Sequence, residues 1–113
     1  MTIANASQLE QFKRGTDYDV ITLLKEPGLS VRLEQMQAGE GEVQHCHKSA
    51  SQFFYVFEGT ATVAVDGKII SLAKSQGLSI SANTAHSIQN RENSWLKFLV
   101  VTQPEMEDGK SVI

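Results

Sequence analysis

Cysteine is nearly absent from this chain, which has a single one among its 113 residues. One cysteine cannot form an internal disulfide, so the fold needs no oxidising compartment, and we expect a cytoplasmic location. The first eight residues have neither a basic start nor an apolar centre, so no signal peptide is expected.

Long apolar runs and blocks of like charge are also missing. The longest apolar runs are Phe53–Phe57 and Phe98–Val101, far short of the roughly 20 residues that cross a bilayer. Ten basic and thirteen acidic residues give a net charge of −3, and charges of either sign are scattered. We therefore expect no membrane partner and no nucleic-acid partner.

Short segments typical of β-strands fill most of the chain. They are rich in β-branched and aromatic residues and are separated by turns that contain Gly, Asn and Ser. The expected strands are 18–25, 29–37, 42–47, 52–58, 60–65, 68–72, 78–81, 87–90 and 95–102. Such a series predicts an all-β barrel or sandwich, and a jelly roll suits it well.

The chain is expected to be one domain over 1–113, with a barrel core at about 20–103 and a loosely ordered polar tail at 104–113. Ser7 and Glu10 have the spacing of a capping box, and Gly15 can end a short N-terminal helix. Asp66-Gly67 between two strand segments predicts a hairpin with a type I′ turn.

Residues 29–37 alternate in character along the expected strand. Apolar side chains at 29, 31 and 33 share one face, whereas Arg32 and Glu34 share the other. The charged pair is either solvated or part of a pocket mouth, and periodicity does not distinguish the two.

All three histidines fall within one pattern that is typical of a metal site. His45 and His47 are two residues apart on an expected strand, so both point to one face about 6.6 Å apart, while Cys46 points away. Gln52 follows at the start of the next strand, and His86 belongs to a later one. Three imidazoles and an amide oxygen predict one divalent transition metal, either Mn, Fe, Co, Ni, Cu or Zn. The alternative is a site of three histidines, in which Gln52 only hydrogen-bonds to a metal-bound water.

Strand alternation also predicts which side chains share the inner face with these ligands. They are Val43, Phe54, Ile88 and Asn90. Each is either a wall of a substrate pocket or ordinary barrel packing.

The spacing Gly39-x5-His45-x-His47-x4-Gln52-x6-Gly59 resembles the first motif of the cupins. The stretch from 80 to 90, with its histidine and an asparagine four residues later, is similar to the second cupin motif. The resemblance spans roughly residues 20–103. It implies a six- to eight-stranded, RmlC-like jelly-roll barrel with one divalent metal near its centre, held by the three histidines and Gln52.

The chain departs from the cupin pattern at several positions. Gln52 stands where glutamate is usual, Asn83 where glycine is common, and Ser81 and Ala85 where proline is common. Asparagine tolerates positive φ better than other non-glycine residues, so the turn before the histidine can survive. A neutral glutamine leaves the full +2 charge on the ion and strengthens its attraction for an anionic substrate.

Three histidines with one glutamine are similar to the ligand sets of two small-cupin groups. One group linearises 4,5-unsaturated uronic acids, and the other consists of aromatic polyketide cyclases. The first group also uses an Asp and an Arg on and after its last strand, and residues 98–106 contain neither.

Two functions remain open from the sequence. The first is a metal-dependent enzyme of isomerase, lyase, cyclase or dioxygenase type, acting on an anionic or oxygen-rich small molecule. The second is a non-catalytic metal-dependent binder of a ligand such as a sugar acid. No general acid or base is identified in either case. We also predict a homodimer through one sheet face, because so short a chain leaves little to cover both sheets.

Overall fold

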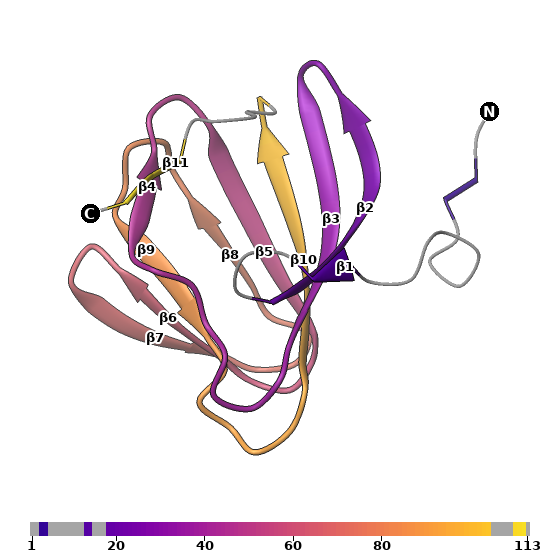
Figure 1. The fold of residues 1–113 in the computed structure, drawn as a ribbon. Coiled ribbons are helices and arrows are strands. Elements are labelled where there is room, and N and C mark those ends of the chain that lie inside the picture. The colour runs from indigo at the N-terminus through magenta and orange to yellow at the C-terminus, as the bar shows by residue number, and fades with distance from the viewer. Residues whose placement is uncertain (1–2, 5–12, 15–17, 105–109, 113) are drawn as a thin grey trace.

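Two antiparallel β-sheets face each other in the computed structural model, which describes residues 3–4, 13–14, 18–104 and 110–112 (Figure 1). The described residues contain no helix. The strands are β1 Lys13–Arg14, β2 Asp19–Glu26, β3 Leu29–Met36, β4 His45–His47, β5 Ser51–Glu58, β6 Ala61–Val65, β7 Lys68–Leu72, β8 Gly77–Ile80, β9 His86–Gln89, β10 Leu96–Gln103 and β11 Lys110–Val112.

The order of strands within each sheet is that of a jelly roll, because neighbours in space come from distant parts of the chain. One sheet has the order β1-β2-β3-β10-β5-β8, and the other has the order β11-β4-β9-β6-β7. The expected all-β jelly-roll barrel is therefore confirmed. The long strands β3, β5 and β10 lie side by side in the first sheet, while the short strands β4 and β9 lie in the second (Figure 1).

The core lies between the two sheets and is built from alternate residues of each strand. The inward side chains of β10 and β5 meet those of the second sheet. They are Phe98, Val100, Phe54 and Val56 in the first sheet, and Val63 and Ile88, among others, in the second. The strands end close to their predicted limits because the period-2 pattern marks them well. The β6–β7 hairpin has positive φ at both Asp66 and Gly67, as a type I′ turn requires.

Strand β3 is unusual because its inward face is polar except for Met36. Ser30 and Glu34 are buried on that face, and Arg32 lies between them. The apolar residues at 29, 31 and 33 therefore face outward, where they continue an apolar outer surface of the sheet. Leu33, Leu99 and Tyr55 form one cross-strand row of this surface, and Val31, Val101 and Phe53 form the next.

Three expectations about the ends of elements need correction or lie outside the described residues. The expected strand 42–47 begins only at His45, because Gly39, Glu40 and Glu42 instead make irregular backbone hydrogen bonds to Ile88 and Asn90. Part of the tail is ordered, since residues 110–112 form β11 and pair with β4. Most of the expected N-terminal helix lies outside the described residues, and its described part, residues 13–14, is strand β1.

Gly59 shows why one tight connection needs glycine. Its φ is +85°, and a Cβ there would lie 2.4 Å from the carbonyl oxygen of Trp95. Both the backbone conformation and the close approach of β10 exclude a larger residue.

Within the described part of the chain, no helix is long and apolar enough to span a membrane.

Candidate metal centre

The three histidines converge because β4 and β9 are paired neighbours in the second sheet. His45 lies directly opposite His86 in the antiparallel register, and His47 lies two residues further along β4 on the same face. The ring centroids of His45 and His86 are 4.4 Å apart, and that of His47 lies 5.1 Å from His45 and 5.8 Å from His86. The i, i+2 spacing thus brings both β4 imidazoles to the third.

Two of the imidazoles are held in one tautomer by backbone carbonyls. His45 Nδ1 lies 2.8 Å from the carbonyl oxygen of Val43, and His86 Nδ1 lies 2.8 Å from that of Thr84. A carbonyl oxygen only accepts hydrogen bonds, so each Nδ1 carries the proton and donates. The neutral rings therefore present Nε2 lone pairs, which is how a carbonyl outside the ligand shell prepares a histidine ligand.

Gln52 reaches the same place from the opposite sheet. It is buried on the inner face of β5, and its Nε2 donates to Thr102 Oγ1 on β10 at 3.1 Å. In this orientation Gln52 Oε1 lies 3.2 Å from His86 Nε2. When the His86 ring is neutral and Nδ1 carries its proton, both atoms are acceptors, and a cation shared between them would stabilise this arrangement.

The arrangement fits a divalent metal ion. Each histidine offers one ring nitrogen, and these nitrogens all lie within 4.8 Å of one another. An ion about 2.1 Å from each nitrogen holds opposed ligands about 4.2 Å apart, so small side-chain movements suffice to close the site. The three histidines and Gln52 are therefore positioned to bind a metal.

The turn before His86 is hydrogen-bonded to the end of β4, which links the second motif to the first. Asn83 has a φ of +64°, which confirms that asparagine can replace the usual glycine. Its backbone N–H donates to the carbonyl oxygen of His47 at 2.6 Å. The turn thus fixes the end of β4 relative to β9, on which the third histidine lies.

The four expected inner-face neighbours have different surroundings. Phe54 is buried, and its ring centroid lies 6.0 Å from that of His86. Ile88 is a fully buried member of the core. Asn90 Nδ2 donates to the carbonyl oxygens of Met36 and Ser94, so its amide links the end of β3 to the loop before β10.

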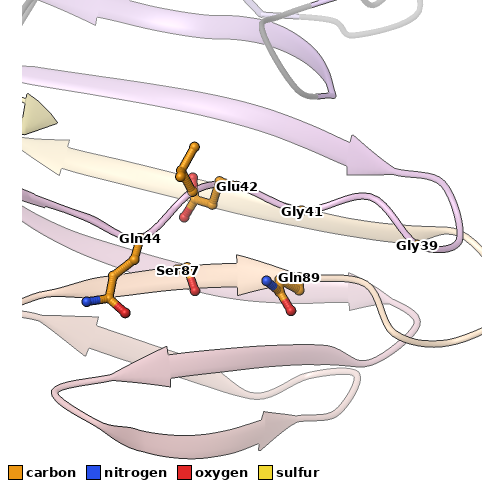
Figure 2. Close-up of a pocket in the computed structure, with 7 residues that line it drawn as sticks. Gly39, Gly41, Glu42, Gln44, Ser87 and Gln89 are labelled. Carbon is orange, nitrogen blue, oxygen red and sulfur yellow. The ribbon is translucent and has the colours of Figure 1, made fainter. Parts of the chain in front are cut away.

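Val43 does not follow the inward alternation that the sequence predicts. It lies before the regular part of β4, and its side chain is 53% exposed. Together with its neighbours it lines a depression of about 560 Å³ on the outer side of β9 (Figure 2). The other lining residues are Gly39, Gly41, Glu42, Gln44, Ser87 and Gln89.

A second polar cluster inside the barrel was not predicted as a site from the sequence. Tyr18 donates its hydroxyl to Glu42 Oε2 at 3.1 Å, and Glu42 Oε1 accepts the backbone N–H of Ile88. Arg32 Nε lies 3.0 Å from Glu34 Oε2. Burial, together with the negative charges of Glu34 and Glu42, raises the pKa of Tyr18 well above 10.0, and Arg32 partly offsets this. The one sequence signal was the shared face of Arg32 and Glu34.

A series of ring contacts connects the two polar clusters. Phe54 contacts His86 on one side and Phe98 on the other, where the ring centroids are 6.2 Å apart. Phe98 in turn lies 6.2 Å from Tyr18.

Comparison with known proteins agrees with this geometry. Two curated Streptomyces proteins are similar over about half of the chain. The tetracenomycin polyketide synthase protein TcmJ of S. glaucescens is 29% identical over 59 residues, which are 52% of this chain and 40% of TcmJ. Polyketide synthase CurC of S. cyaneus is 36% identical over 55 residues, which are 49% of this chain and 36% of CurC. The chain thus spans well under two thirds of the length of either relative.

Among solved structures, an RmlC-like cupin from Shewanella frigidimarina superimposes with a TM-score of 0.85 at 22% identity. The match covers 96% of this chain and 95% of that one. The cupin domain family matches residues 32–102, which include all three histidines and Gln52. The protein therefore belongs to the cupin family.

Proposed function

We propose that the protein is a metal-dependent enzyme that acts on a small anionic or oxygen-rich molecule. The observation that carries the proposal is the convergence of His45, His47, His86 and the Gln52 amide oxygen, with two Nε2 lone pairs fixed by backbone carbonyls. A bound Mn, Fe, Co, Ni, Cu or Zn ion would polarise a substrate oxygen and stabilise developing negative charge.

The residues around the site have separate tasks in this proposal. Gln52 adds no charge, so the ion keeps its full attraction for an anion. Thr102 holds the Gln52 amide so that its oxygen faces the histidines. Phe54 forms an apolar wall against His86 and keeps water away from that side of the site. Ile88 and Asn90 stay as candidate pocket residues, whereas Val43 faces the depression outside β9.

The reaction class is proposed from the chemistry of the site together with the relatives. Two relatives are polyketide synthase proteins, which favours cyclase or isomerase chemistry, while lyase and dioxygenase reactions can use the same ligands. The partner is therefore a small-molecule substrate. A cytoplasmic location fits the lone Cys46.

A second candidate function is a metal-dependent binder without turnover, for example of a sugar acid. One observation favours it: among the described residues, the ligand-competent cluster consists of histidines alone. The buried carboxylates Glu34 and Glu42 belong to the other cluster.

The metal proposal is tested by elemental analysis of protein purified without an affinity tag. We expect about one equivalent of a transition metal in the wild type and its loss in His45→Ala/His47→Ala. Gln44→Ala, an exposed change next to the ligand strand, is the control and should keep the metal. A wild type that takes up no ion after reconstitution with each metal contradicts the proposal.

Enzyme and binder are distinguished at Gln52. With metal bound, Gln52→Ala and Gln52→Glu should change the rate constant for turnover if the protein is an enzyme. If substrate-like acids bind with altered affinity but are never converted by any metal form, the binder is the correct function.

We also propose a homodimer formed through the outer face of the β1-β2-β3-β10-β5-β8 sheet. The two apolar cross-strand rows on this face are neighbours, and burying such a surface favours association. Val101→Lys should yield monomers in light scattering at tens of micromolar protein. Thr62→Lys, on the outer face of the other sheet, should not. A strictly monomeric wild type contradicts the proposal.

A further inference from the structure

Arg32 is a basic side chain that points into the barrel from β3. Ser30, Glu34 and Met36, which share its face by strand alternation, are all buried. In the sheet register, Arg32 lies opposite Val100, which in turn lies opposite Phe54. Arg32 therefore belongs to the same inward row as the aromatic ring that contacts His86.

The next inward row along these strands contains the metal-site amide. Ser30 lies opposite Thr102, and Thr102 lies opposite Gln52. Adjacent inward rows are about 6.6 Å apart along a strand. The Arg32 side chain thus starts one row from Gln52, on the sheet that faces the histidines, with Glu34 in the row on its other side.

The Arg32 side chain is anchored at one atom and accessible at others. Its Nε is buried 3.0 Å from Glu34 Oε2, a contact of opposite charges without the alignment of a hydrogen bond. The side chain as a whole is nevertheless 38% exposed. The accessible part comes from its other atoms, which include the two terminal NH2 groups. An arginine held in this way keeps a fork of donors that matches a carboxylate.

The charges inside the barrel also favour an anion once the site is loaded. Among the described residues, Glu34 and Glu42 are buried carboxylates, and Arg32 offsets the charge of one of them. A divalent ion at the histidines adds +2, so the ionised groups sum to about +1. A bound monoanion neutralises this excess in a low-dielectric interior.

We infer that Arg32 binds a carboxylate of the substrate, so that the substrate class is a small carboxylic acid with a second oxygen for the metal. This inference rests on the proposed function. Glu34 is a positioning residue, because it holds the guanidinium and does not itself touch the ligand.

The test uses malonate as the probe and the metal-loaded protein. Malonate affinity is measured by calorimetry for wild type, Arg32→Gln and Arg32→Lys, with Arg91→Gln as the matched control. Arg91 is exposed and contacts Gln89 outside the barrel, so its loss should leave affinity unchanged. We expect Arg32→Gln to weaken malonate binding about 10- to 100-fold, the value of a charge-assisted hydrogen bond. Arg32→Lys should be intermediate, and uncharged malonamide should not distinguish the variants.

Metal content, measured on each sample, separates this inference from the metal proposal. If the wild type holds no metal, the proposed function fails, and an Arg32-dependent rise in melting temperature with malonate in the metal-free protein still supports the role of Arg32. If Arg32→Gln does not fold, Arg32→Lys and Glu34→Gln supply the comparison. Malonate affinity that is equal in wild type and the folded Arg32 variants overturns the inference.

Discussion

Two polar clusters lie inside the same barrel, and they differ in charge and in how they are held. The candidate metal centre consists of His45, His47, His86 and Gln52, none of which carries a fixed charge. Backbone carbonyls orient His45 and His86, and Thr102 orients Gln52. The second cluster, Tyr18, Arg32, Glu34 and Glu42, consists mainly of charged groups that balance one another. Ring contacts of Phe54 with His86 and with Phe98, and of Phe98 with Tyr18, connect them. The difference teaches that side chains without a fixed charge can be buried before an ion binds. Buried charged side chains instead need a partner of opposite charge within the folded chain.

Truncating Phe98 should have the largest effect on stability. Phe98→Ala deletes a fully buried ring that contacts Phe54 and Tyr18. We expect a loss of about 3–5 kcal/mol in the free energy of unfolding, measured with urea. Phe57→Ala, which truncates a 45% exposed ring, is the control. Equal losses in the two variants would show that Phe98 is not a central packing residue.

Breaking the charged cluster should come next. Glu34→Ala leaves Arg32 Nε without its neighbouring carboxylate, which costs about 2–3 kcal/mol because the arginine is partly exposed. Glu58→Ala removes an exposed carboxylate at the end of β5 and should cost little. The free energy of unfolding of both variants is measured with urea. Their metal content should be unchanged. Metal loss in Glu34→Ala would mean that the two clusters are not independent.

Adding a carboxylate to the candidate metal centre should strengthen metal binding. Gln52→Glu adds a negative charge next to the cation, and we expect the metal dissociation constant to fall at least about tenfold, or about 1.4 kcal/mol. Competition with a chromogenic chelator measures it. Gln44→Glu adds the same charge outside the site. Unchanged affinity in Gln52→Glu would indicate that Gln52 is not a ligand.

The smallest effect concerns pH and belongs to the charged cluster alone. The pKa of Tyr18 is higher in the folded protein than in the unfolded chain, because burial and nearby carboxylates disfavour the phenolate. The resulting stability is present below about pH 10 and is lost as pH rises towards the folded pKa, by about 1.4 kcal/mol per pH unit. Urea midpoints between pH 8 and 11 should therefore fall more steeply for wild type than for Tyr18→Phe. Parallel curves would contradict this.

Sequence reasoning predicted which side chains form the candidate metal centre because that information is local. Two histidines on one face of a strand and a third in a second motif need no knowledge of the tertiary fold. The alternation of β3 was equally clear, but it did not reveal which face points inward. Both faces of that sheet are apolar elsewhere, so the inward position of Arg32 and Glu34 followed only from pairing with β10.

The remaining differences have a similar origin. Val43 is exposed because regular pairing of β4 starts only at His45, where β9 becomes its partner. Strand β11 was missed because a short polar segment gains its structure from a distant partner and not from its own propensity.

The pairing of β11 with β4 has a practical consequence for handling the protein. Lys110 lies opposite His47 and Val112 lies opposite His45, so the strand that carries two ligands is bordered by residues near the C-terminus. A peptide fused at this end would therefore follow a strand that pairs with the strand carrying two proposed ligands. A polyhistidine tag at that end would bring competing imidazoles near the proposed site, whereas β1 and β2, the first described strands, belong to the opposite sheet.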